Sequence, residues 1–376
     1  MKAMTRLSAA ALTSAAVMLA GFGGATSALA AGAGHAVFVQ TDNTTANQVL
    51  AYERGDDGTL TEIGAYDTGG VGGELEGSVV DHLASQGSLA YDREDGLLYA
   101  VNAGSDTVSV FAVLGEHLAL RQVISSGGTF PVSVTSSHGV VYVLNAQEGG
   151  SLQGFSVSAG RLTPLAGSSR ALGLNPTETP QFTHTPGQVA FSPDGSQLIV
   201  TTKANGSDID VFRVKAAGRL SSSPVVNSEP GAVPFAVSFD QQGNLVVSEA
   251  GTNAVASFLL HEDGTLAQLD AVGTGEAATC WIARAGSHFY ASNAGSGTLT
   301  TFSSSRGGQL LSDLGNTETD AGTVDGTVTG GGRFLYVQTG AAGIVDEFAI
   351  ASQGALTKIG SVTVPGAVGG EGIVAG

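Results

Sequence analysis

The feature that most constrains the fold of this chain is a short pattern that recurs seven times. In its second occurrence an apolar strand over 97–101 reaches Asn102 and a polar turn, and an alternating strand then ends at Phe111. The seven occurrences span residues 36–52, 97–111, 140–155, 198–212, 245–258, 289–302 and 334–348. Alternation with a period of two is typical of half-buried β-strands. The chain is therefore predicted to consist of β repeats.

Two further strands complete each repeat. A third strand is expected after a Gly-x-Leu turn, and a fourth, more apolar strand, such as residues 189–191, leads into the next repeat. The Gly-x-Leu turns begin at Gly58, Gly160, Gly218, Gly264 and Gly354. Four strands in each of seven repeats predict an all-β fold, a seven-bladed β-propeller with four antiparallel strands per blade. The repeats average about 49 residues, as in other propellers.

The two ends of the chain indicate how the ring closes. The first predicted strand, at Ala36, is of the second type, so the first repeat lacks its own inner strand. Residues 372–375 resemble a fourth-type strand that has no repeat after it. We expect this C-terminal strand to complete the first blade, which would also cover an exposed sheet edge.

The first thirty residues have the pattern of an export signal. Lys2 and Arg6 precede a mostly apolar stretch over 7–22, and Ala28-Leu29-Ala30 fits a small-residue cleavage site. Residues 1–30 are therefore predicted to be a signal peptide and residues 31–376 the propeller domain. Phe22 stands where a lipoprotein would carry its lipidated Cys. A secreted, extracellular protein is expected.

Composition excludes several partners and cofactors. The 376 residues include 33 acidic and 15 basic side chains, for a net charge of -18, so nucleic-acid binding is not expected. The single Cys can form neither an internal disulfide nor a Cys-ligated zinc site. The seven His residues show no metal-ligand spacing. We predict no metal, no cofactor, no membrane insertion and a monomer.

Ligand sites in propellers usually lie where the inner strands enter the central channel. The seven predicted entry segments place Gln86, Ser133, Gln188, Asp325 and Glu371 at this point. Two carboxylates there could divide acid and base roles, because burial and mutual repulsion would raise one pKa. Glu371, Asp325, Gln188 and Gln86 are the predicted catalytic set. The alternative is that these side chains cap strands and bind channel water.

Four further residues are candidates for contact with a substrate. Trp281, the only Trp, lies in an entry segment with Phe235 in the preceding one, and either ring could stack on a ligand or pack between blades. Ser133 and His184 lie at or near other entries. Cys280 adjoins Trp281, but no His lies near it in sequence, so an inert buried thiol is expected.

Three strings in the repeats carry a family resemblance. Residues 99–102, 142–145 and 290–293 look like the Tyr-Val-Thr-Asn propeller repeat. With Phe-Ser-Pro-Asp-Gly at 191–195, the chain resembles the seven-bladed lactonase family over about residues 36–376. That family includes 6-phosphogluconolactonase and carboxymuconate cyclase-like enzymes.

The resemblance implies a His-x-His element that enters the inner strand of the fourth blade. Counted back from Phe191, these positions hold Thr185 and Gly187, so the catalytic histidine motif is absent there. The family's Asp-Leu-Gly turn is replaced by residues 202–206. Two functions follow as expectations. One is an exported lactonase-like enzyme that opens or forms a lactone of a small organic acid or sugar in the channel. The other is a non-catalytic secreted propeller that binds a small molecule, a glycan or a surface protein.

Overall fold

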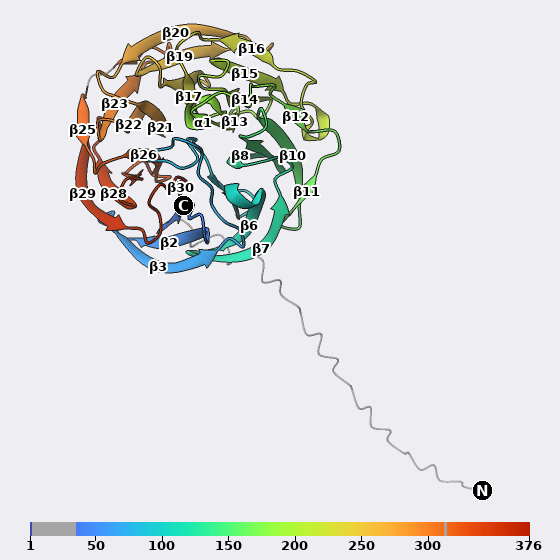
Figure 1. Ribbon diagram of the computed structural model, residues 1–376. Helices are drawn as coiled ribbons and strands as arrows, with labels where there is room; N and C mark the ends of the chain where they lie inside the picture. The colour runs from blue at the N-terminus through green and yellow to red at the C-terminus, as the bar shows by residue number, and fades with distance from the viewer. Residues whose placement is uncertain (2–34, 312–313) are drawn as a thin grey trace.

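The strands form seven sheets arranged as blades around one axis (Figure 1). The computed structural model describes Met1 and residues 35–311 and 314–376. In each blade four antiparallel strands lie side by side, and a short extra strand joins two of the blades. The predicted seven-bladed propeller is confirmed. The predicted signal peptide lies outside the described residues, apart from Met1.

Blades are numbered along the chain and their strands are given from the axis outward. Blade 1 contains β30 (Ile373–Ala375), β1 (Ala36–Gln40), β2 (Gln48–Arg54) and β3 (Leu60–Asp67). Blade 2 contains β4 (Leu89–Asp92), β5 (Leu97–Asn102), β6 (Thr107–Leu114) and β7 (His117–Ser125). Blade 3 contains β8 (Pro131–Ser137), β9 (Val140–Asn145), β10 (Ser151–Ser158) and β11 (Arg161–Pro164), with β12 (Arg170–Ala171) on β10. Blade 4 contains β13 (Val189–Phe191), β14 (Gln197–Thr201), β15 (Asp208–Arg213) and β16 (Val225–Ser228).

The remaining blades follow the same order. Blade 5 contains β17 (Pro234–Phe239), β18 (Leu245–Glu249), β19 (Ala254–Leu260) and β20 (Leu266–Gly273). Blade 6 contains β21 (Thr279–Ala285), β22 (His288–Asn293), β23 (Thr298–Ser304) and β24 (Leu310–Leu311), with β25 (Asn316–Glu318) on β23. Blade 7 contains β26 (Thr323–Val328), β27 (Phe334–Thr339), β28 (Ile344–Ile350) and β29 (Leu356–Thr363). The helical elements are α1 (Gln181–His184), η2 (Ala103–Ser105) and η3 (Ala216–Gly218).

The ring closes as the sequence predicts. β30 pairs antiparallel with β1, with Phe38 opposite Val374, so the end of the chain supplies the inner strand of the first blade. One predicted outer strand is placed wrongly. Residues after Gly218 form a turn with a single bridge between Val214 and Leu220, and the outer strand of blade 4 begins only at Val225. The Gly-x-Leu signal there marks a turn rather than a strand.

The hydrophobic core lies between neighbouring blades. Phe38 and Val49 of blade 1, for example, pack with Leu98 and Phe111 of blade 2, and similar clusters fill the other seams. Buried tyrosines from the recurring strings add a hydrogen bond to three seams. The hydroxyls of Tyr142, Tyr290 and Tyr336 donate to the carbonyls of Gly218, Gly354 and Gly58 in the next blade, at 2.7, 3.0 and 2.7 Å. The Tyr strings and the Gly turns thus recur together because they meet across seams.

A long connection between β3 and β4, residues 68–88, crosses the channel mouth, where the inner strands begin. We call it the strap; in Figure 1 it is the light-blue trace over the centre of the ring. Its main chain bonds to distant blades: the amide of His82 donates to Gly369 O at 2.8 Å and that of Gln86 to Gly187 O at 3.1 Å. Gly340 permits close contact, because a Cβ there would lie 1.7 Å from Val80 O. The strap is therefore an integral cover of the mouth.

Candidate functional site

A cavity of about 400 Å³ lies beside the strap at the channel mouth. Its walls come from the strap, from α1 and from the mouth loops of blades 4, 5 and 6. Most of the lining side chains are apolar, and Asp81 and Lys203 are the ionised ones. The lining residues are Val79, Val80, Asp81, Ala84, Phe182, Thr183, Lys203, Val233, Phe235, Ala250, Ala278, Cys280, Trp281, Ala294 and Gly295.

Two aromatic rings form one wall of this cavity. Phe235 and Trp281 stand at the entries of neighbouring inner strands, β17 and β21, which brings their rings together. The ring centroids lie 4.9 Å apart at an interplanar angle of 62°, an edge-to-face contact. The Trp281 indole N–H donates to Ser85 O of the strap at 2.6 Å. Both predicted substrate-binding aromatics thus line the cavity.

Lys203 is the one cation that lines the cavity. It follows β14 in a left-handed conformation (φ 53°), and its side chain is 1% exposed. Nζ donates to Ala84 O at 2.7 Å, Phe182 O at 2.6 Å and Thr185 Oγ1 at 3.1 Å. Burial lowers the Lys203 pKa to about 7, whereas the charge of Asp81 raises it. Three acceptors match the three donors of an ammonium group and favour the charged form.

Asp81 brings a carboxyl from the strap to the same cavity. It is 3% exposed, and its two oxygens accept the amides of Leu83 at 2.8 Å and Ser85 at 2.9 Å. Burial raises the pKa of Asp81 to about 6, against the lowering effect of these amides and of the Lys203 charge. At neutral pH the carboxylate form predominates. The Ala84 amide also lowers the Asp81 pKa, and a carboxylate that receives three amides still has lone-pair capacity for a water or a ligand.

The predicted pair Glu371 and Asp325 lies elsewhere, in a packed cluster near the ring closure with Asp42. Glu371 is fully buried and accepts the Ser88 amide, while its own amide donates to Asp42 Oδ2 at 2.8 Å. Asp325 accepts the amides of Gly326 at 2.8 Å and Ile373 at 3.4 Å. Burial raises the pKa of Asp42 to about 8 and that of Asp325 to about 7.

Burial also raises the pKa of Glu371 well above its ordinary value, and the charges of Asp325, Asp81 and Asp42 add to the effect. The structure thus brings Glu371 and Asp325 together with Asp42 near the ring closure. Neither Glu371 nor Asp325 lines the cavity. Their catalytic role stays a prediction.

The other three entry residues are held by main-chain partners. Gln86 spans the channel mouth, with Nε2 donating to Ile282 O at 3.1 Å and Oε1 accepting the Ile282 amide at 2.9 Å. Gln188 Oε1 accepts the Val237 amide at 2.6 Å. Ser133 Oγ donates to Gln86 O at 2.8 Å. These bonds fit the alternative interpretation that the side chains cap strands and tie blades together.

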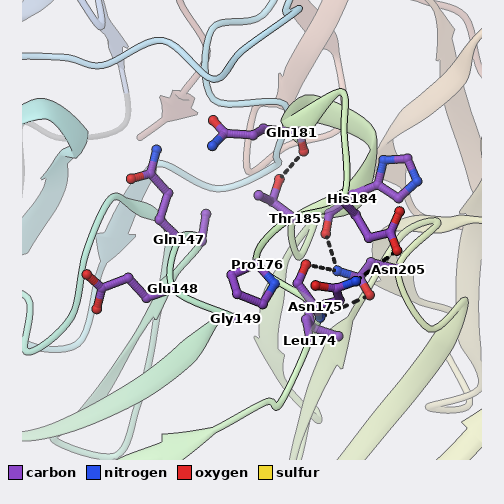
Figure 2. Close-up of a pocket in the computed structure, with 12 residues that line it drawn as sticks. Gln147, Glu148, Gly149, Leu174, Asn175, Pro176, Gln181, His184, Thr185 and Asn205 are labelled. Atoms are coloured by element: carbon purple, nitrogen blue, oxygen red, sulfur yellow. Dashed lines mark hydrogen bonds between the residues drawn. The ribbon is translucent and has the colours of Figure 1, made fainter.

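His184 lies in a second pocket, of about 190 Å³, between blades 3 and 4 (Figure 2). Gln147 and Glu148 stand on one side and α1 with Asn205 on the other, around Leu174 and Pro176. His184 Nδ1 is within hydrogen-bond distance of Pro180 O, at 3.0 Å. α1 separates this pocket from the cavity, because Phe182 and Thr183 line the cavity while Gln181 and His184 line the second pocket.

Cys280 lines the cavity but is poorly suited to act as a nucleophile. Burial raises the pKa of its thiol to about 12, although the charge of Lys203 opposes the shift. Thiolate is therefore scarce at neutral pH. Among residues 35–311 and 314–376, no group of three or more His, Cys, Asp or Glu side chains is arranged to hold a metal ion.

Sequence reasoning missed Lys203, Asp81 and Asp42. Lys203 lies two residues after the end of β14, a strand whose residues are all buried, in a chain with only 15 basic residues. This is the one signal that the sequence offered. Asp81 had none, because the strap shows no periodicity. The site of Lys203 depends on Ala84, 119 residues away, which no local pattern reveals.

Comparison with known proteins gives one family match and many structural matches. A family model described as "Lactonase, 7-bladed beta-propeller" matches residues 74–369. No curated protein matches the sequence. A putative 6-phosphogluconolactonase from Bacteroides uniformis has a TM-score of 0.72 at 18% identity and covers 89% of this chain and 97% of its own.

Two other solved structures widen the comparison. A periplasmic gluconolactonase from Pseudomonas aeruginosa has a TM-score of 0.70 at 20% identity and covers 90% of this chain and 98% of its own. A virginiamycin B lyase from Staphylococcus aureus has a TM-score of 0.53 at 11% identity and covers 78% of this chain and 89% of its own. At sequence identities of 20% or less, the similarity to these three structures is a similarity of fold. Within the described residues, no helix has the length and apolar character needed to cross a membrane.

Proposed function

Because the chain belongs to the family of seven-bladed β-propeller lactonases, we propose that it opens or forms the ring of a small lactone at the channel mouth. The observation that carries this proposal is the cavity beside the strap, where Asp81 and Lys203 face a common volume of about 400 Å³. A lactonase needs a base for the attacking water and positive charge for the developing oxyanion. The two side chains supply one of each.

The proposed ring opening begins with a water between Asp81 and the bound lactone carbonyl. The Asp81 carboxylate takes a proton from this water as its oxygen bonds to the carbonyl carbon. Lys203 stabilises the resulting oxyanion through its charge rather than by a direct hydrogen bond, because its three donors are already engaged. When the intermediate collapses, the ring C–O bond breaks and the leaving alkoxide takes the proton held by Asp81, which regenerates the Asp81 carboxylate. Ring formation is the reverse.

We also propose that the protein is exported and works outside the cytoplasm as a monomer. The n-region, apolar stretch and small-residue site within residues 1–30 support export. The Pseudomonas neighbour, itself a periplasmic gluconolactonase, is consistent with a lactonase propeller in such a compartment. A fusion of residues 1–30 to a reporter that is active only after export tests this part, and a cytoplasmic reporter contradicts it.

A non-catalytic binding protein is the second candidate function. One observation favours it: Lys203 and Asp81 are both occupied by main-chain partners, as structural side chains often are. A binding protein would keep the cavity and its ligand but would show no turnover. The experiment below distinguishes the two.

The test is a pH-stat hydrolysis screen on the purified protein, with lactones of both sugars and organic acids. Asp81→Asn is expected to lower kcat by about 10²–10⁴-fold, the usual contribution of a general base. In the wild type, kcat/KM should rise with pH through about 6, where Asp81 becomes ionised. This rise should be absent in the variant.

Asp240→Asn is the matched control. Asp240 is 4% exposed and accepts the amides of Gln242 and Asn244, so it has the same kind of capping role in a hairpin of blade 5. It should lose stability without losing kcat. Loss of activity in Glu371→Gln or Asp325→Asn, with Asp81→Asn fully active, would move the acid–base chemistry to the packed cluster. No turnover on any lactone would favour the binding protein.

A further inference from the structure

The cavity beside the strap offers a ligand very few hydrogen bonds. The three donors of Lys203 Nζ already bond to protein acceptors, and the Trp281 N–H donates to Ser85 O of the strap. Thr183 Oγ1 lies 3.1 Å from Pro180 O, to which it donates, and 2.8 Å from His184 Nδ1. Among the lining side chains, the Asp81 carboxylate provides the main remaining hydrogen-bonding capacity, and three strap amides, of Leu83, Ala84 and Ser85, already act on it. These polar groups suffice for one reacting centre and little else.

A sugar lactone matches such a cavity poorly. Each of its hydroxyls loses water on binding, and a buried hydroxyl without a partner is costly. The second pocket, by contrast, has amide and carboxylate side chains along its walls (Figure 2). Polar groups are therefore available on the mouth side of the molecule, but they lie on the other side of α1. The cavity itself is built for apolar surface.

The charges around the cavity also disfavour an anionic ligand. Asp81 lines it, and the neighbouring carboxyls Asp42, Asp325 and Glu371 have pKa values raised by burial, so they supply no positive charge to the cavity. Lys203 is the only opposing charge in the lining and is already neutralised in part by Asp81. A phosphate or a free carboxylate would therefore lose its hydration without gaining an uncompensated positive charge or an unengaged Lys203 donor in exchange.

The cavity is large enough to hold a lactone ring together with a further apolar group. Small side chains from the mouth loops of blades 5 and 6, Ala250, Ala278 and Ala294, leave its volume open beside Phe235 and Trp281. At the rim, Val79 of the strap is 79% exposed and offers apolar surface to a ligand that extends outward. A site of this size and composition is typical of apolar small molecules.

We infer that the ligand of this cavity is an uncharged lactone that carries an alkyl or acyl chain of several carbons. Its ring lies near Asp81 and Lys203, and its chain packs against Phe235 and Trp281. The lactone ring in this inference rests on the proposed function. The apolar, uncharged character of the ligand rests on the cavity alone.

The fluorescence of Trp281 gives a direct measurement of binding, because it is the only Trp in the chain and lines the cavity. The titration uses γ-lactones with unbranched side chains from methyl to hexyl and the cyclic ketones of the same shape, which cannot be hydrolysed. Glucono-δ-lactone and an alkyl lactone with a terminal carboxylate complete the series. Each added methylene should lower Kd by about fourfold until the cavity is full. The last two compounds should bind at least tenfold more weakly than the hexyl lactone.

Ala250→Leu should shorten the chain length at which affinity stops rising. Ala204→Leu, an exposed position that lines neither pocket, is the matched control and should leave the series unchanged. Tight binding of long-chain ketones and lactones without hydrolysis would support this inference and contradict the proposed function. Kd values independent of chain length, or preference for glucono-δ-lactone, would overturn this inference and leave lactone hydrolysis intact.

Discussion

The two halves of the channel mouth hold similar side chains in opposite surroundings. On the side of blades 7, 1 and 2, Asp42, Asp325 and Glu371 are packed against main-chain amides, and none of them lines the cavity. On the side of blades 4, 5 and 6, Asp81 and Lys203 are equally buried but face about 400 Å³ of open volume. We call these the closed half and the open half.

The comparison shows that burial and a shifted pKa do not by themselves identify a functional site. Both halves contain carboxyls whose pKa is raised by burial. In the closed half the carboxyls bond to the C-terminal segment that completes the ring, which gives them a structural role. In the open half a carboxylate and an ammonium lie beside space for a ligand. The open volume is the property that separates the two.

The largest expected effect concerns the open half. Lys203→Met removes the donor for the buried Ala84 carbonyl and the part-buried Phe182 carbonyl, and leaves Asp81 without its countercharge. The expected loss of unfolding free energy is about 3–5 kcal/mol, as for other buried charges deprived of a partner. Urea denaturation measures it. Lys215→Met, at an exposed lysine of the same blade, is the control and should change stability by less than about 0.5 kcal/mol.

Hydrogen exchange on the same variant tests whether the two halves are independent. Amides of the strap near Ala84 should exchange faster in Lys203→Met, since that carbonyl is a bonding point between strap and blade 4. The Glu371 amide, bonded to Asp42, should keep its protection. Equal loss of protection at both places would show that the mouth is one cooperative unit and would end the distinction.

The next effect is a rise in stability with falling pH that comes mainly from the closed half. A buried carboxyl with a raised pKa is protonated in the native state and ionised in the unfolded chain between about pH 4 and its native pKa. Its stabilising effect is complete below about pH 4 and is lost as the pH rises through the native value, about 7 for Asp325 and about 8 for Asp42. Between about pH 4 and its native pKa, each such group raises the free energy of unfolding by about 1.4 kcal/mol for each unit by which the pH is lowered.

Thermal unfolding between pH 8 and pH 5 measures this trend, and Tm should increase toward pH 5. Carboxyls with a lowered pKa, such as Asp57 and Asp263, act in the opposite sense only below about pH 4. Glu371→Gln and Asp42→Asn should each reduce the dependence of Tm on pH, because each removes about one proton from the difference between the protons bound by the native and unfolded states. A Tm that is constant or falls toward pH 5 would show that these carboxyls are ionised in the folded protein.

The sequence predicted the blades far better than the open half of the site, for a physical reason. Strand alternation and turns are local, so Gln188 and Asp325 could be placed at inner-strand entries from their neighbours alone. Trp281 and Phe235 were found for the same reason. The strap has no alternating pattern, and its course over the mouth depends on contacts such as His82 with Gly369. Lys203 and Asp81 come together only after the strap is in place.

The smallest expected effect concerns two buried tyrosines in the blade seams, one with a hydrogen-bond partner for its hydroxyl among the described residues and one without. Tyr142 and Tyr99 occupy equivalent positions in blades 3 and 2 and are fully buried, but only the Tyr142 hydroxyl has a partner, Gly218 O. Tyr142→Phe should cost about 1 kcal/mol and leave that carbonyl without its donor. Tyr99→Phe should be neutral or slightly stabilising, because it removes a buried hydroxyl that bonds to none of the described residues. Urea denaturation of the two variants under one set of conditions compares them, and equal losses would mean that the Tyr99 hydroxyl is hydrogen-bonded in solution. If the two differ as expected, buried polar groups in this propeller have to be judged by their partners, as at the mouth.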